Sequence, residues 1–92
     1  MILKLDPNYA DAYYNLGYIA LVFKKDYDTA ISRFTEAIRA NKDYVEAYYN
    51  RGLAHEFKGQ TREALEDYHN ALGIFPEYKP AKERLMALEG NR

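Results

Sequence analysis

The residues that most often carry acid–base or metal chemistry are sparse in this sequence. Its two histidines, His55 and His69, are fourteen positions apart, which is not the spacing of a metal-binding pair on one helix. The chain has no cysteine, which excludes a thiolate metal site, a cysteine nucleophile and disulfide bonds. It also has no glycine-rich phosphate loop, no G-x-S-x-G motif and no paired carboxylates in an apolar setting. We therefore expect no enzyme activity, no cofactor and no bound metal.

Charge and hydropathy exclude further classes of protein. The 92 residues fit one small domain, and Lys+Arg 13 against Asp+Glu 14 are mixed along the chain. A nucleic-acid binder needs a basic face, which this pattern does not supply. The longest apolar run, Ile19–Phe23, has five residues, whereas a membrane span needs about 20. Because Met1–Pro7 lacks the layout of a secretory signal, we expect a cytoplasmic protein with neither a membrane span nor a nucleic-acid partner.

The sequence repeats itself with a period of 34 or 35 residues. The block Ala12–Asn15 returns letter for letter as Ala47–Asn50. Further matches at these intervals are Tyr9, Tyr44 and Tyr78; Gly17 and Gly52; Phe23 and Phe57; Ala30 and Ala64; Phe34 and Tyr68. The interval changes from 35 to 34 between Gly17 and Ala20, so the first unit contains one extra residue there.

Within each unit the apolar spacing is that of amphipathic helices. Ala30, Ile31, Phe34, Ala37 and Ile38 fall at i, i+1, i+4, i+7 and i+8, which is one stripe of a helix. Structure breakers fall between such stripes. We expect the end of a helix at about 1–5 and then helices at about 9–24, 27–41, 44–58, 62–74 and 79–89. The predicted class is all-α, with each unit a pair of helices joined by a tight turn.

A helix pair of this length with these small and aromatic positions resembles the tetratricopeptide repeat (TPR). The first unit supplies Tyr13, Leu16, Gly17, Ala30, Phe34 and Ala37, and the second supplies Tyr48, Gly52, Ala64, Tyr68, Ala71 and Pro76. The resemblance implies an α-α superhelix (solenoid) of two TPR hairpins plus a C-terminal capping helix. It divides the chain into a preceding helix tail and turn at 1–9, repeats at 10–44 and 45–78, and the cap at 79–92.

The chain departs from the TPR pattern at a few places. Arg51 replaces the apolar residue represented by Leu16, and Lys25 stands where the second unit has Gly59. Lys42 replaces the turn proline, so we expect a less sharply broken junction between the repeats. The extra residue can either form a π-bulge within the helix or lengthen the turn around Lys24–Asp26. We expect it in the turn.

The resemblance implies a binding surface, because the first helix of each TPR lines a concave groove that holds extended partner segments. The inward positions are Asp11, Tyr14, Asn15 and Tyr18; Glu46, Tyr49, Asn50, Leu53 and Phe57; Glu83, Arg84 and Ala87. We select Tyr14, Asn15, Tyr18, Tyr49, Asn50, Leu53 and Arg84 as partner-binding residues. The tyrosines would pack on the partner, the asparagines would bond its backbone, and Arg84 would contact a carboxylate. The alternative is that these tyrosines pack between the repeats as ordinary core.

The expected function is non-catalytic binding of a protein or peptide partner. A second hypothesis is self-association as a homo-oligomer or domain swap, because Ile2 and Leu3 suggest a truncated helix pair at the start of a longer array. A third is a partial clamp for the C-terminal carboxylate tails of chaperones. Asn15, Asn50 and Arg84 match that clamp, whereas Asp11 and Pro80 occupy its two lysine positions.

Overall fold

The computed structural model describes residues 7–90, so the helix end predicted at 1–5 lies outside the described residues. Within 7–90 every regular element is helical, which confirms the all-α class. The elements are α1 (Pro7–Tyr18), the π-helix η1 (Ile19–Lys24), α2 (Tyr27–Ala40), α3 (Val45–Phe57), α4 (Thr61–Ile74) and α5 (Lys79–Glu89). These bounds agree with the predicted helices to within two residues at each end.

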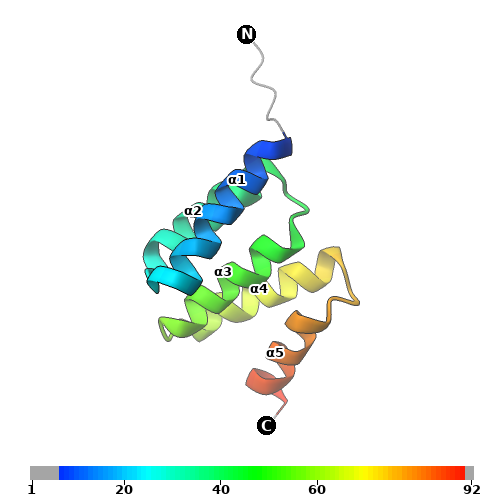
Figure 1. Cartoon of the computed structure of the whole chain (residues 1–92). Helices are drawn as coiled ribbons and strands as arrows, with labels where there is room; N and C mark the ends of the chain where they lie inside the picture. The colour runs from blue at the N-terminus through cyan, green and yellow to red at the C-terminus, as the bar shows by residue number, and fades with distance from the viewer. Residues whose placement is uncertain (1–6, 91–92) are drawn as a thin grey trace.

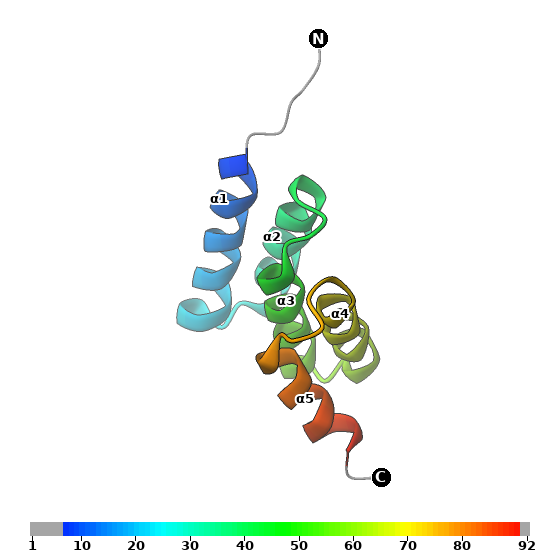
Figure 2. The ribbon, with the colours of Figure 1, turned by 90° about the vertical axis from the view of Figure 1, so that its right-hand side faces the viewer.

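The helices form two antiparallel hairpins followed by a single helix (Figure 1). α1 packs on α2 and α3 on α4, while α2 packs on α3 and α4 on α5. Seen from the side, α1, α3 and α5 lie toward one face and α2 and α4 toward the other (Figure 2). α1 and α3 are only loosely packed on each other, and a cleft lined by residues of α1, η1, α2 and α3 lies between them.

Each hairpin is held by an aromatic ring pressed against a glycine of the facing helix. A Cβ on Gly17 would lie 2.7 Å from Cε1 of Phe34, and one on Gly52 would lie 2.6 Å from Cε1 of Tyr68. Both rings are fully buried. The two glycines therefore allow a close helix approach, and a large aromatic ring fills the space across each hairpin.

The extra residue of the first unit lies in the helix, so the prediction that it lengthens the turn is wrong. Ile19–Lys24 is a π-helix, and only Lys25 and Asp26 separate it from α2. The wider turn of a π-helix lets two consecutive residues, Ala20 and Leu21, both reach the core at 3% and 5% exposure. Both residues belong to the core cluster that includes Phe34 of α2 and Ala54 of α3.

The turn after η1 contains a strained residue. Lys25 adopts the left-handed conformation, with φ 53°, at the place where the second hairpin has Gly59 with φ 79°. Asp26 then caps α2, because its carboxylate accepts hydrogen bonds from the backbone N–H and the hydroxyl of Thr29 at 3.2 and 2.7 Å. These bonds lower the pKa of Asp26.

The junction between the hairpins is sharply broken although it has no proline, contrary to the expectation drawn from Lys42. The chain leaves α2 at Asn41, whose side-chain oxygen accepts the backbone N–H of Asp43 at 3.0 Å. The backbone N–H of Tyr44 donates to the carbonyl of Asn41 at 3.2 Å. An asparagine side chain that closes its own turn replaces the missing proline.

Arg51 joins three helices from the position where the pattern has an apolar residue. Its guanidinium makes two hydrogen bonds to the carboxylate of Asp67, at 2.8 and 2.7 Å, and a third to the hydroxyl of Thr35 at 3.1 Å. Asp67 is 3% exposed. A bidentate ion pair of this kind links α2, α3 and α4.

We expect Lys25→Gly to stabilise the fold. A left-handed non-glycine residue costs about 1 kcal/mol, and glycine removes that cost, so the free energy of unfolding should rise by about 1 kcal/mol in urea titrations. The matched control is Gly59→Ala, which should lower stability through strain alone because nothing lies within 4 Å of the added Cβ. A loss of stability in Lys25→Gly would contradict the strain.

We expect Asp67→Ala to destabilise the fold severely, because it leaves the half-buried Arg51 guanidinium without its carboxylate. Breaking a buried ion pair costs about 3 kcal/mol. The control is Glu36→Ala, which removes the exposed pair with Arg39 and should change stability by less than about 1 kcal/mol. Equal effects in thermal melts of the two variants would show that the Arg51 link does not hold the helices together.

Candidate functional site

Tyr14 is a half-buried residue of α1 that contacts aromatic rings of both hairpins. The ring stacks on Tyr44 at 5.0 Å between centroids and tilts against Phe34 at 5.6 Å. The hydroxyl accepts a hydrogen bond from Nδ2 of Asn50 at 2.8 Å. Burial, followed by the nearby Tyr78 and Glu46, raises the pKa of Tyr14 to about 12, so the ring is neutral at physiological pH.

Tyr49 repeats this arrangement one unit later. Its half-buried ring lies 5.7 Å from Tyr68 and 5.7 Å from Tyr78. Burial raises the pKa of Tyr49. Both residues thus have a packing role, and replacing them with alanine would disturb the core as well as the groove.

Three of the selected residues, Tyr18, Asn50 and Leu53, line one apolar cleft of about 430 Å³ between η1 and α3. The other lining residues are Leu21, Val22, Lys25, Tyr27 and Phe57. Tyr18 and Val22 are each 43% exposed and Phe57 is 61% exposed. A volume of this size is within the range of about 300–1,000 Å³ found for ligand pockets.

Sequence reasoning missed Leu21, Val22 and Tyr27 as members of this cleft. Leu21 and Val22 belong to the π-helix, and Lys25 caps it. The extra residue between Gly17 and Ala20 was the available signal, because it marks where this helix departs from the regular repeat.

The two selected asparagines differ in their surroundings. Asn50 is 8% exposed, and its Nδ2 donates to the hydroxyl of Tyr14 and to the backbone carbonyl of Glu46 at 2.8 and 3.0 Å. Its Oδ1 has no hydrogen-bond partner among residues 7–90. Asn15 is exposed on α1 and does not line the cleft.

Arg84 is already paired within the protein. Its Nε donates to Glu56 at 3.2 Å and its Nη2 donates to the other oxygen of the same carboxylate. The hydroxyl of the buried Tyr68 also donates to Glu56, at 2.7 Å. The hydrogen bonds to Glu56 raise the pKa of Arg84. The guanidinium that a carboxylate clamp would present to its ligand thus holds an internal carboxylate.

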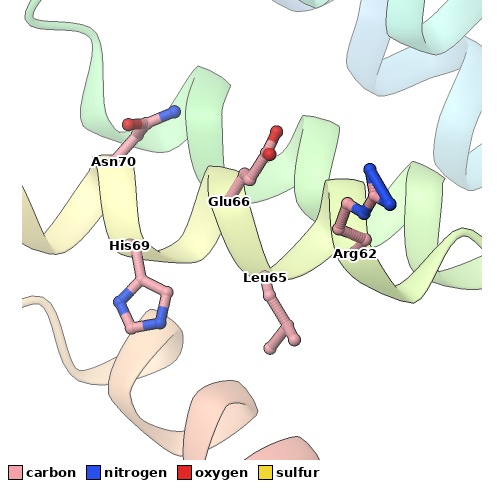
Figure 3. A pocket seen from close by; sticks show the side chains of 5 residues that line it. All are labelled: Arg62, Leu65, Glu66, His69 and Asn70. Carbon is pink, nitrogen blue, oxygen red and sulfur yellow. The ribbon is translucent and has the colours of Figure 1, made fainter.

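A second hollow, of about 460 Å³, lies along α4 and is formed by one helix only. In Figure 3, Leu65 and His69 point toward α5, whereas Glu66 and Asn70 point to the other side of α4. His69 lies 3.6 Å from Glu89, and His55 is bonded to Gln60 elsewhere. These side chains do not converge on a common point, so they form no catalytic set.

The described part of the chain contains no group of His, Cys, Asp and Glu side chains that could hold a metal ion. Among residues 7–90 no helix combines the length and the apolar character that crossing a membrane requires.

Comparison with known families gives three matches of one kind. Models of the tetratricopeptide repeat match residues 45–78, 20–56 and 1–32. Together they extend over residues 1–78, which contain both helical hairpins.

Single proteins also match this chain over most of its length. The chain is 32% identical over 80 residues to human serine/threonine-protein phosphatase 5 and 31% identical over 89 residues to human protein O-mannosyl-transferase TMTC3. These matches cover 87% and 97% of this chain but only 16% and 10% of the relatives. The crystal structure of MamA superposes with a TM-score of 0.84 at 33% identity, over 95% of this chain and 51% of MamA.

Proposed function

Because this chain belongs to the tetratricopeptide repeat family, we propose that it is a non-catalytic module that binds an extended segment of a partner protein. TPR domains in general bind proteins or peptides. The chain spans between a tenth and a sixth of the relatives named above, so their whole-protein activities are not assigned to it. We also propose the repeat division 10–44 and 45–78, with 1–9 as the preceding tail and 79–92 as the cap.

The observation that carries this proposal is the apolar cleft at the end of the groove. Tyr18, Val22 and Phe57 leave large apolar surface in contact with water, which burial against a partner would remove. Such burial contributes about 25 cal/mol per Å² of apolar surface. One large apolar side chain of the partner would enter the cleft, and Oδ1 of Asn50 would accept a backbone N–H beside it.

The carboxylate-clamp hypothesis receives less support from the same surface. Arg84 would have to release Glu56 before it could bind a ligand carboxylate. Asp11, at a position where the clamp has lysine, would repel that carboxylate.

One observation favours self-association as a second function. An apolar stripe on the outer side of α1 and η1 is exposed: Tyr9 48%, Leu16 49%, Ile19 42% and Phe23 74%. The repeat equivalents of Leu16 and Phe23 are Arg51, which bonds Thr35 of α2, and Phe57, which stacks on Tyr27 at 5.4 Å. The outer stripe therefore has the position of a surface that accepts a helix. We propose a second copy as its occupant only as the alternative to groove binding.

The groove is tested with Tyr18→Ala/Val22→Ser, a double variant of exposed cleft residues. Peptides selected from a random display library on the wild-type protein should bind the variant at least about tenfold more weakly, since it removes about 1.4 kcal/mol or more of apolar contact. The control is Leu16→Ala/Phe23→Ser, which removes exposed apolar groups outside the cleft and should retain peptide affinity. Failure to select any peptide, or equal loss in both variants, would refute groove binding.

Self-association is tested with the same two variants in sedimentation velocity over a concentration series. If the outer stripe joins two copies, the wild-type sedimentation coefficient should rise with concentration. Leu16→Ala/Phe23→Ser should abolish the rise because it removes the apolar contact, and Tyr18→Ala/Val22→Ser should keep it. If the wild-type protein is a monomer at every concentration, self-association is not its function.

A further inference from the structure

The upper end of the groove, away from the apolar cleft, carries two carboxylates at equivalent repeat positions, Asp11 and Glu46. We call this pair the acidic edge. Asp11 accepts the hydroxyl of Tyr44 at 2.7 Å, which places its carboxylate on the groove side of α1. Glu46 is exposed one turn before Asn50 on α3, where its backbone carbonyl accepts Nδ2 of Asn50 at 3.0 Å. Burial mainly, with the charge of Glu46 contributing, raises the pKa values of Tyr14, Tyr44 and Tyr78.

Neither carboxylate of the acidic edge has an ion-pair partner among residues 7–90. The basic groups near the groove are engaged elsewhere: Arg84 with Glu56, Lys79 with Glu83, Lys58 with Asp28 and Lys82 with Glu77. Lys25 lines the cleft at the opposite end, and Lys42 and Asp43 offset each other in the loop before α3. The acidic edge therefore retains a net negative charge.

Aromatic rings beside the acidic edge add to its attraction for a cation. Tyr14 and Tyr44 stack at 5.0 Å, and the partly exposed Tyr78 lies near Glu46. The negative face of a tyrosine ring attracts Lys or Arg within about 6 Å. A carboxylate next to such rings is a site for an organic cation.

The cleft and the acidic edge are separated by a distance that an extended chain can span. Glu46 and Leu53 are seven residues apart on α3, which at 1.5 Å per residue is about 10 Å. An extended peptide covers this distance in about three residues. Between the two points lies Asn50, whose free Oδ1 can accept a backbone N–H of the peptide.

We propose that the segment bound in the groove is cationic, with a large apolar side chain in the cleft and a Lys or Arg about three residues away at Asp11 and Glu46. This inference rests on the groove binding proposed above and adds the chemistry of the partner to it. It reverses the expectation from sequence, in which Arg84 would select a negatively charged partner.

The test uses the full chain and three short fluorescent peptides on a Ser/Thr background, acetylated and amidated to remove terminal charges. Each has one Leu anchor, and the position three residues away is Lys, Gln or Glu. In fluorescence anisotropy titrations the Lys peptide should bind about tenfold more tightly than the Glu peptide at low salt, and less so at high salt. Asp11→Asn/Glu46→Gln should reduce this preference to less than about threefold.

The control is Glu63→Gln/Glu66→Gln, which makes the same change in net charge on exposed positions of α4 and should leave the preference intact. Thermal melts of both double variants check that each is folded. If the three peptides bind with equal affinity, and that affinity is lost in Tyr18→Ala/Val22→Ser, the cationic proposal is wrong but groove binding still holds. Tighter binding of the Glu peptide would also overturn the cationic proposal. If none of the three peptides binds but library-selected peptides do bind the cleft, the proposed partner chemistry is wrong. If neither kind of peptide binds, the proposed function itself is wrong.

Discussion

The fold depends on two places where a helix has no side chain opposite a large ring. Gly17 faces Phe34 and Gly52 faces Tyr68, at distances that leave no room for a methyl group. These contacts set how closely the helices of each hairpin approach, and so how much apolar surface each hairpin buries. A hairpin of this size cannot bury its remaining apolar stripe alone, so it must stack on a neighbour. The stacking of α2 on α3 and of α4 on α5 follows from that need.

The groove is the geometric consequence of this stacking. α2 packs on both α1 and α3, and Tyr14 of α1 stacks on Tyr44 at the start of α3. Tyr14 and Tyr49 are partly buried and pack against the two core clusters, which supports the alternative that they are core residues, while their groove role stays a prediction. If they do contact a partner, these rings are already held by packing, so they would lose little further side-chain entropy on binding.

Much of the fold could be predicted from the sequence, because apolar periodicity and the repeat register both depend on local spacing. Helix bounds and the glycine–aromatic contacts belong to this group. The π-helix could not be placed, because the interval change between Gly17 and Ala20 shows that a residue is inserted but not whether burying Leu21 outweighs the loss of regular hydrogen bonds. Likewise, the repeat pattern identified Arg84 as an inward position but not its pairing with Glu56. That pairing joins residues 28 positions apart, and only the angle between α3 and α5 determines whether they meet.

The pairing of Arg84 with Glu56 also decides the electrostatic character of the groove. A free arginine there would offset the negative charge of Asp11 and Glu46, and the surface would have little preference for the sign of its partner. An internal carboxylate, itself held by the hydroxyl of the buried Tyr68, neutralises that arginine. In the proposed binding mode, the acidic edge would set the charge preference and the cleft would supply the apolar contact. Stable protein interfaces usually bury ~1,200 Å² or more in total, and two hairpins offer a short groove, so affinity from apolar contact is limited. Under that limit, charge complementarity contributes mainly to the association rate and to the choice among partners.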